Sequence, residues 1–397
     1  MKRTGVVAIL VFVCGIVALL AQPCLAAEAK IIKVGTVNGL TGWMAAGEQP
    51  TNDGMKLAAD WINQTGGITV KGVKYKIQLI TEDSKSSPEG MADACTKLVE
   101  KDKVKFILGG VNTVMNIAAS SVTEPAKVFR LSNYTCGNPE ESGPQFPLTF
   151  FSNSNIQSMR PQLVYLKETH PEAKRLALSH PGDGAGKWRR AHLEPYAQEL
   201  GMTVVYSEEW PGETVDFTPV VKKALASNPD AYIFTDGWAY HAGAQIKALR
   251  ALGFKGAILS TDSEIVSEVL QLTGSEAGEG YFASAWDVMD PNMRPIMKKE
   301  VVPRASARLG KINQWQPWGW NTVWILKQAI ESAQSLDPVV VAKNLRTMKK
   351  IETVFGTATI GGEKTFGSKC VISAPQAIFV AKGGQAVFVR WNETSVP

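Results

Sequence analysis

The strongest constraint on this chain of 397 residues is a regular alternation of short apolar, β-branched runs with helical patterns. The runs in its first half are KIIKVGTV, YKIQLITED, VKFILGG and VFRLS. Between the first two, Met55, Ala59 and Ile62 recur on one face of a helix. Before the third, Pro88 suits a first helical turn that Ser87 can cap. Strands that alternate with helices in this way predict a parallel sheet covered by helices.

The same alternation restarts in the second half of the chain, with the runs RLALSH, MTVVYSEEW, DAYIFTDG and GAILSTD. The segment CGNPEESGPQFPLTFFSNSN separates the two series and is rich in Gly, Pro, Ser and Asn. We therefore expect a domain boundary near 150–155. After EGYFASAW the pattern predicts helices at about 292–309 and 318–333, then a terminal hairpin with its turn at 382–385. The sequence predicts an α/β fold with two Rossmann-like lobes, in which ligands bind beyond the carboxyl ends of the strands.

The N-terminal segment has the pattern of a secretory signal. Lys2 and Arg3 precede a long apolar run, which ends at Pro23 and at the small residues Cys24 and Ala26. We expect cleavage after Ala26, which removes residues 1–26; an uncleaved membrane anchor is the alternative. No small-residue lipobox precedes either cysteine of this segment, which disfavours a lipoprotein. We expect an exported, periplasmic protein.

Removal of this segment leaves Cys95, Cys136 and Cys370. In an oxidising compartment, three cysteines predict one disulfide and one buried thiol. Sequence alone leaves the pairing open. We favour a bridge between Cys136 and Cys370, which both lie in loop-like stretches, and a core position for Cys95 in the helical pattern MADACTKLVEK.

The stretch HPGDGAGKWRR, residues 180–190, resembles a phosphate-binding loop but fails its spacing. The Walker pattern requires glycine where Pro181 stands, and a hydroxyl residue where Trp188 follows Lys187. The dinucleotide pattern fails because Lys187 occupies the third glycine position. The sequence therefore predicts no nucleotide cofactor.

The sequence also contains no common motif for a metal site or for catalysis. No histidine has a histidine partner four residues on, and no C-x-x-C pair occurs, so we expect no metal site. The common serine-nucleophile motifs are missing, so we expect no enzyme, with a periplasmic hydrolase as the alternative. The formal charge of +5 is spread along the chain, which predicts no nucleic-acid partner.

The first half contains IKVGTVNGLTGWMAAGEQPTNDGMKLAADWINQTGGI, followed by KIQLITEDSKSSPEGMADACTKLVEKDKVKFILGG. VDFTPVVKKALASNPDAYIF and IKALRALGFKGAILS follow in the second half. In order and spacing these strings resemble the periplasmic solute-binding proteins of branched-chain amino acid ABC transporters, the Leu/Ile/Val type. The resemblance covers nearly all of the chain after the leader. It implies a type I periplasmic binding fold, in which a three-crossing hinge joins two lobes. The crossings are expected near 150–155, 283–286 and 366–369, and the lobes are 27–152 plus 285–366, and 153–284 plus 367–397.

The resemblance also implies a function. Such a protein closes on one small solute by hinge motion, docks on a membrane permease and carries out no covalent chemistry. We expect a monomer that binds an amino acid or a related small carboxylate with an apolar or aromatic body. A binder of aromatic carboxylates or amides in the same transporter family is the alternative, and a sensory ligand-binding module is another. The exact solute, its affinity and the partner permease are not readable from the sequence.

The resemblance places the ligand contacts of the first lobe in loops after strands. Thr113, at the start of the third helix, is expected to hold the ligand carboxylate, because a helix N-terminus offers N–H groups to an anion. Simple N-capping by Asn112 is the alternative role for this helix start. Trp43 is expected to form an aromatic wall, with core packing as its alternative. The loop Tyr134 to Cys136 adds a backbone N–H and a hydroxyl, or is a plain turn. The expected set is Trp43, Asn112, Thr113, Tyr134, Thr135 and Cys136.

In the second lobe, Trp238 is expected to pack on the solute, with Asp236 just before it. Asp262 falls where relatives place the acidic residue that receives an α-ammonium, and Glu264 is a rival for that place. A buried carboxylate needs such a cationic partner, although Asp262 could instead cap a helix or lie in a solvated loop. Ala185 stands where relatives often keep a tyrosine. We therefore expect a larger pocket, or a wall moved to Trp188 or Trp286, and a solute other than leucine.

Overall fold

The computed structural model describes residues 30–182, 185–262, 266–285, 288, 292–310 and 312–397, which form two separate sheets. The first sheet has nine strands in the order β12-β13-β14-β6-β5-β4-β1-β3-β2. Its central strands β1, β4, β5 and β6 are parallel, as the alternating pattern predicts. The strands are β1 (Lys30–Asn38), β2 (Ile68–Val70), β3 (Val73–Asp83), β4 (Phe106–Leu108), β5 (Phe129–Ser132), β6 (Thr149–Phe151), β12 (Ile351–Thr353), β13 (Gly356–Gly361) and β14 (Val371–Ser373).

Helices from both ends of the described chain accompany this sheet. They are α2 (Ala45–Gln64), α3 (Pro88–Glu100), α4 (Thr113–Thr123), η1 (Met297–Val301), α11 (Val302–Leu309), α12 (Trp315–Ala333), α13 (Pro338–Leu345) and α14 (Glu363–Phe366). The predicted cap of α3 is confirmed, because the Ser87 hydroxyl accepts the N–H of Gly90 at 3.0 Å. Asn112 caps α4 by accepting the N–H of Val114 at 3.0 Å.

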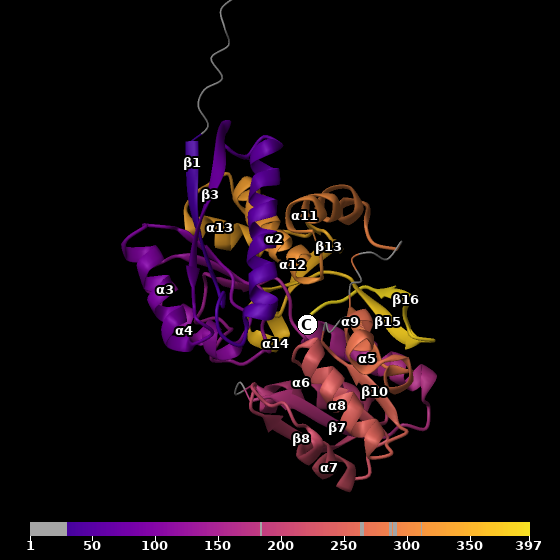
Figure 1. Cartoon of the computed structure of the whole chain (residues 1–397). Helices are drawn as coiled ribbons and strands as arrows, with labels where there is room; N and C mark the ends of the chain where they lie inside the picture. The colour runs from indigo at the N-terminus through magenta and orange to yellow at the C-terminus, as the bar shows by residue number, and fades with distance from the viewer. Residues whose placement is uncertain (1–29, 183–184, 263–265, 286–287, 289–291, 311) are drawn as a thin grey trace, which may run out of the picture. The chain divides into compact units, whose positions relative to one another are not determined.

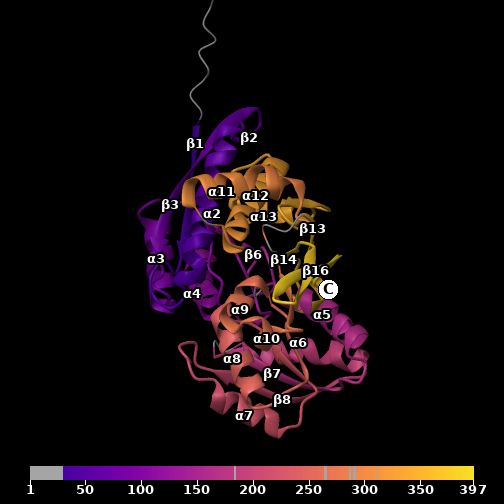
Figure 2. The same ribbon diagram turned by 45° about the vertical axis from the view of Figure 1, so that its right-hand side comes forward.

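Helices α2 and α12 pack against each other although they lie far apart in sequence (Figure 2). Two glycines make this contact close. A Cβ at Gly319 would lie 1.8 Å from the carbonyl oxygen of Thr51, and one at Gly54 would lie 2.0 Å from that of Gln316. Because any larger residue would push the backbones apart, the pair fixes the first turn of α12 beside α2.

The second sheet has seven strands in the order β16-β15-β11-β10-β9-β7-β8. The strands are β7 (Arg175–Pro181), β8 (Thr203–Trp210), β9 (Ala231–Phe234), β10 (Ala257–Ser260), β11 (Phe282–Ala285), β15 (Gln376–Lys382) and β16 (Gln385–Asn392). Its helices are α5 (Ile156–Thr169), α6 (Gly186–Glu199), α7 (Thr218–Ala226), α8 (Ala239–Ala251), α9 (Val266–Thr273) and α10 (Ser275–Gly278). The predicted terminal hairpin is confirmed, with Lys382 opposite Gln385 and with the hairpin next to α9 (Figure 1).

The last crossing between the sheets differs from the sequence expectation. The expected boundary at 366 assigned everything after it to the second lobe. Instead, β14 pairs with β6 in the first sheet at Val371 and Phe151, and the chain reaches the second sheet only at β15. The run VIS is short and apolar, so it fits either sheet, and its sequence carries no signal of its partner.

The expected disulfide is also wrong. None of Cys95, Cys136 and Cys370 is in a disulfide, and all three are buried. Cys136 and Cys370 lie in loop-like stretches, as expected, but each side chain is enclosed rather than bridged. In the described part of the chain, no helix combines the length and the apolar character needed to span a membrane.

Candidate binding pocket

A pocket with ≈ 500 Å³ of empty space lies where the carboxyl ends of the strands of both sheets meet. Val111 and Asn112 follow β4, and Tyr134 follows β5. From the second sheet, Pro181 ends β7, the segment Asp236 to Trp238 follows β9, and Asp262 follows β10. This is the position in which parallel α/β sheets bind ligands.

Aromatic rings form a large part of the pocket wall. The rings of Trp238 and Trp315 are 5.0 Å apart between centroids, and those of Trp315 and Trp318 are 5.3 Å apart. Tyr134 lies 6.4 Å from Trp318 at an interplanar angle of 18°. Trp43 completes the aromatic lining. A chain of rings at these distances is a rigid apolar surface that suits a flat or branched apolar body.

Sequence reasoning missed Trp315 and Trp318, although the helix predicted at about 318–333 begins beside them. The missed signal is the run WQPWGW at the start of α12, which concentrates tryptophans at one helix end. The expected replacement for the tyrosine at Ala185 was Trp188 or Trp286. Trp188 lies under the Lys187 ammonium, 5.3 Å from it, and is not part of the pocket lining. Trp286 lies outside the described residues.

Two carboxylates lie in the pocket wall. Asp262 is 7 % exposed and accepts a hydrogen bond from the Tyr134 hydroxyl at 3.3 Å. Burial raises the pKa of Tyr134 well above its usual value, and the charges of Asp236 and Asp262 raise it further. Tyr134 therefore keeps its proton and remains a donor to Asp262. Glu264, the rival of Asp262, lies outside the described residues.

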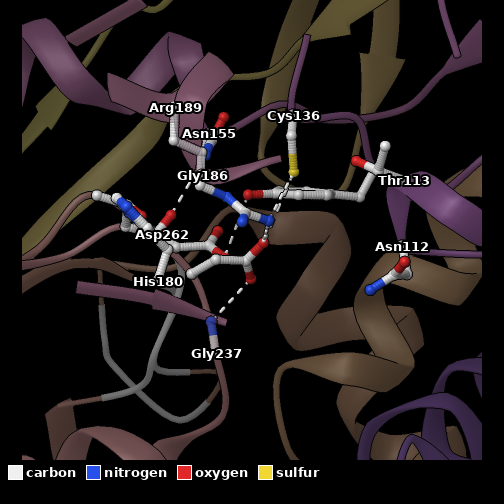
Figure 3. Close-up of polar contacts among 12 residues, drawn as sticks. Asn112, Thr113, Cys136, Asn155, His180, Gly186, Arg189, Gly237 and Asp262 are labelled. Atoms are coloured by element: carbon white, nitrogen blue, oxygen red, sulfur yellow. Dashed lines mark hydrogen bonds and ion pairs between the residues drawn. The ribbon is translucent and has the colours of Figure 1, made fainter. Parts of the chain in front are cut away.

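Asp236 forms an ion pair with Arg189, whose side chain is fully buried. The Arg189 guanidinium also donates to the sulfur of Cys136 at 2.9 Å, and Figure 3 shows it pointing toward that residue. The N–H of Gly237 donates to Asp236 at 2.8 Å. Arg189 extends from the first turn of α6 and bridges residues that follow strands of the two sheets. The stretch HPGDGAGKWRR thus supplies a buried cation to the back of the pocket, which sequence reasoning did not identify.

Thr113, Thr135 and Cys136 do not line the pocket; the two hydroxyls and the backbone N–H of Cys136 point to Glu141. Its Oε1 atom accepts from the hydroxyl of Thr113 at 3.3 Å, from that of Thr135 at 2.8 Å and from the N–H of Cys136 at 3.0 Å. Asn112 lines the pocket, and in Figure 3 its side chain stands apart from that of Thr113. Asn112 therefore caps α4 and lines the pocket, whereas the hydroxyl of Thr113 binds Glu141.

The pocket thus brings together six of the nine residues expected from the sequence: Trp43, Asn112, Tyr134, Asp236, Trp238 and Asp262. It adds Trp315, Trp318 and His241 to them. No group of three or more His, Cys, Asp or Glu side chains among the described residues is placed to hold a metal ion.

His241 contacts the pocket as a neutral imidazole. Its Nδ1 atom accepts the N–H of Trp238 at 3.3 Å, so its Nε2 atom donates to the carbonyl of Gly212 at 2.9 Å. Burial lowers the pKa of His241 from 6.5 to about 4, and the bond to Gly212 offsets part of this effect. The side chain therefore carries no charge at neutral pH.

A network around Glu48 holds the loop that carries Trp43. Glu48 is 1 % exposed and accepts the N–H of Gly39. Asp83 accepts the N–H of Leu40 at 2.9 Å, and Ser86 accepts that of Met44 at 3.1 Å. Burial raises the pKa of Glu48 from 4.5 to about 7; the Gly39 hydrogen bond opposes this rise and the Asp83 charge adds to it.

A second hollow with ≈ 950 Å³ of empty space adjoins the pocket and shares Trp43, Asn112 and Pro181 with it. Glu209, Glu213 and the segment Trp210 to Gly212 line its other side.

Comparison with known proteins adds a family. Residues 31–377 match the family described as periplasmic binding protein. The chain is 25% identical over 336 residues to Leu/Ile/Val-binding protein homolog 3 of Brucella melitensis, covering 83% of this chain and 86% of that protein. It is 23% identical over 338 residues to a Leu/Ile/Val-binding protein of Rhizobium johnstonii, covering 83% and 87%.

Solved structures share the fold at lower identity. A leucine-binding protein of Thermotoga maritima superposes with a TM-score of 0.75 at 21% identity, covering 91% of this chain and 98% of that one. An ABC transporter solute-binding protein of Rhodopseudomonas palustris, solved with p-hydroxybenzoic acid, gives 0.74 at 19% identity, covering 92% and 97%. These structures confirm the expected two-lobed α/β fold.

Proposed function

The chain belongs to the periplasmic binding protein family, and on that premise we propose that it is the solute-binding component of an ABC importer. It binds an amino acid or a related small solute with an apolar or aromatic body and delivers it to a membrane permease. The observation that carries this proposal is the pocket at the strand ends of both sheets, lined by aromatic rings and by Asp262.

The lining of the pocket supports this solute class. The rings of Trp43, Trp238 and Trp318 offer contact to an apolar or flat body. Asp262, nearly buried, offers a carboxylate to an ammonium group, which is the partner that a buried acid needs. The Leu/Ile/Val-binding relatives support an amino acid. The relative that holds p-hydroxybenzoic acid makes an aromatic acid the second candidate, because the aromatic wall fits a planar ring.

We propose the following cellular setting. The protein is exported after removal of residues 1–26, acts in the periplasm as a monomer, and catalyses no reaction. Its two lobes each contain one sheet, and the chain crosses between them after β6, after β11 and after β14. Hinge motion at these crossings opens and closes the pocket, and the closed form docks on the permease. Nucleic acid is not a partner.

A thermal-shift screen tests the proposal. The full chain without residues 1–26 is heated with a panel of amino acids, their amides and amines, and aromatic acids. A true solute raises the unfolding temperature, because it binds the folded state alone. We expect at least one compound to do so, and isothermal titration gives its affinity. If no member of the panel raises the unfolding temperature, the proposed function is wrong.

Two tryptophan variants locate the site of binding. Trp43→Ala removes one aromatic wall, so we expect affinity for the identified solute to fall by about tenfold or more. Trp188→Ala is the control, because Trp188 lies outside the pocket. Equal affinities in the two variants would place the solute elsewhere.

A further inference from the structure

Glu141 presents a buried carboxylate at the place where the resemblance expects the carboxylate of the solute. Its side chain has 0% exposure. Besides the hydroxyls of Thr113 and Thr135 and the N–H of Cys136, its Oε1 atom accepts the N–H of Asn138 at 3.3 Å. The hydroxyls of Thr113 and Thr135 and the N–H of Cys136, which the sequence predicts for a ligand carboxylate, are therefore engaged by a carboxylate of the chain itself.

Two further polar residues, Asn116 and Arg130, stabilise this position of Glu141. The side-chain amide of Asn116 donates to Oε2 of Glu141 at 2.7 Å. The oxygen of the same amide accepts from Arg130 at 2.9 Å, and Arg130 is 1% exposed. Both carboxylate oxygens of Glu141 thus accept hydrogen bonds, and Asn116 links Glu141 to the buried cation Arg130. A carboxylate held by this many hydrogen bonds is costly to displace.

These two hydroxyls and this N–H are therefore already used by one carboxylate. A solute carboxylate at the start of α4 would lie beside Glu141, and two carboxylates side by side repel each other. It would also compete for hydroxyl and N–H groups that Glu141 already uses. The chain thus carries inside its fold a carboxylate at the place where the resemblance predicts that of the solute.

The charge around the pocket points to the opposite kind of solute group. Asp236 and Asp262 lie in the wall, and no lysine or arginine is among the described residues that line it. Arg189 lies behind the wall, where it pairs with Asp236. His241 is neutral at pH 7, as its hydrogen bonds require. The faces of the tryptophan rings attract cations through their quadrupoles.

We propose that the pocket selects an ammonium-bearing solute that has an aromatic or branched apolar body and no free carboxylate, such as an amine or an amino-acid amide. The ammonium group meets Asp262, the body lies among Trp238, Trp315 and Trp318, and Glu141 substitutes for the solute carboxylate. This inference rests on the proposed function, since it assumes that the pocket binds the transported solute.

Matched ligand sets test the inference on the unaltered protein. Each set keeps one body and changes its ends: phenethylamine, phenylalaninamide, phenylalanine and 3-phenylpropionate, and the corresponding set built on leucine. Titration calorimetry at pH 7 measures each affinity. We expect the amine or the amide to bind at least about tenfold more tightly than the amino acid, and the acid without an amine to bind most weakly. Amino acid or acid binding that equals or exceeds amine binding overturns the inference but leaves the proposed function intact. Absence of binding by every member of both sets and of the wider panel overturns both.

The variant Asp262→Asn tests whether the negative charge of Asp262, rather than its shape, contributes to binding. The variant keeps a hydrogen-bonding side chain of the same size and loses the negative charge. We expect amine affinity to fall by about tenfold or more while binding of a neutral amide that lacks the amine, such as 3-phenylpropionamide, stays within about twofold. Equal losses for both ligands would show that Asp262 recognises no cation.

Variants of Glu141 test its role as an internal carboxylate. Glu141→Ala leaves the donors around a space that acetate can fill, so we expect a lower unfolding temperature that acetate restores and chloride at equal ionic strength does not. Glu140→Ala removes a neighbouring exposed charge, and we expect no acetate effect there. If acetate and chloride act alike on Glu141→Ala, the donors do not form a carboxylate site. If that variant does not fold, the ligand sets on the unaltered protein still decide the inference.

Discussion

Replacing Glu48 by glutamine should stabilise the protein at neutral and alkaline pH. Glu48 is 1% exposed, and its pKa in the folded state is about 7 instead of 4.5, chiefly because burial disfavours the charged form. Below pH 4.5 the carboxyl group is protonated in both the folded and the unfolded state, so its contribution to stability is complete. Between pH 4.5 and 7 the unfolded chain releases this proton first, and folding stability falls as the pH rises.

The size of the effect follows from the shift. One pKa unit corresponds to about 1.4 kcal/mol, so a change from 4.5 to about 7 amounts to about 3 kcal/mol above pH 7. Glutamine has nearly the same shape, can still accept the N–H of Gly39, and does not titrate. The stability of Glu48→Gln relative to the unaltered protein should therefore rise by about 3 kcal/mol between pH 4.5 and 8.

Urea unfolding at half-unit steps from pH 4.5 to 8, followed by circular dichroism, measures this difference. Glu89→Gln is the control, because Glu89 is exposed in the first turn of α3. We expect its stability profile to run parallel to that of the unaltered protein. A parallel profile for Glu48→Gln as well would refute the reasoning, since it would mean that Glu48 ionises as easily in the folded protein as in the unfolded chain.

Three further outcomes follow from the structure. The pKa of His241 is lowered from 6.5 to about 4, so the stability of the folded state should fall by about 3 kcal/mol as the pH drops through this window, and His241→Gln should lose less in the same urea series. Arg189→Met leaves Asp236 without its buried partner, and we expect urea unfolding to show a loss of about 3–5 kcal/mol. Because Cys95, Cys136 and Cys370 are buried and none is in a disulfide, a thiol reagent should label none of them in the native protein without residues 1–26 and all of them in guanidinium, and a reductant should leave unfolding unchanged.

The sequence predicts well which loops surround the site, for a physical reason. Strand runs have a clear pattern, and in parallel sheets their carboxyl ends gather at one edge, so residues just after them can be placed together. Within the loops after these strands, the resemblance singles out Asn112, Tyr134, Asp236 and Asp262, and all four line the pocket. Their positions depend on the order of elements along the chain, which local pattern determines.

The sequence does not show in the same way where a side chain points or which group it contacts. Thr113 follows Asn112 directly, yet its hydroxyl serves Glu141 behind the wall. Glu141 is next to the exposed Glu140 in sequence, and only the path of the loop after β5 encloses it. Trp318 lines the pocket, and Arg189 pairs with Asp236 behind it, because α12 and α6 begin at particular angles to their sheets. Such angles arise from packing between segments far apart in sequence, so no local pattern carries them.

The way in which each sheet is completed has a consequence for the synthesis of the chain. β6 remains an open edge of the first sheet until β14 pairs with it, and β11 remains one until β15 arrives. An unpaired edge can recruit other strands, so the growing chain is most vulnerable to aggregation just before its final segment is made. Trp315 and Trp318 also come late, on α12. The polypeptide thus acquires all strands of both sheets and a complete pocket only near the end of translation. A chain that stops short of that point has neither.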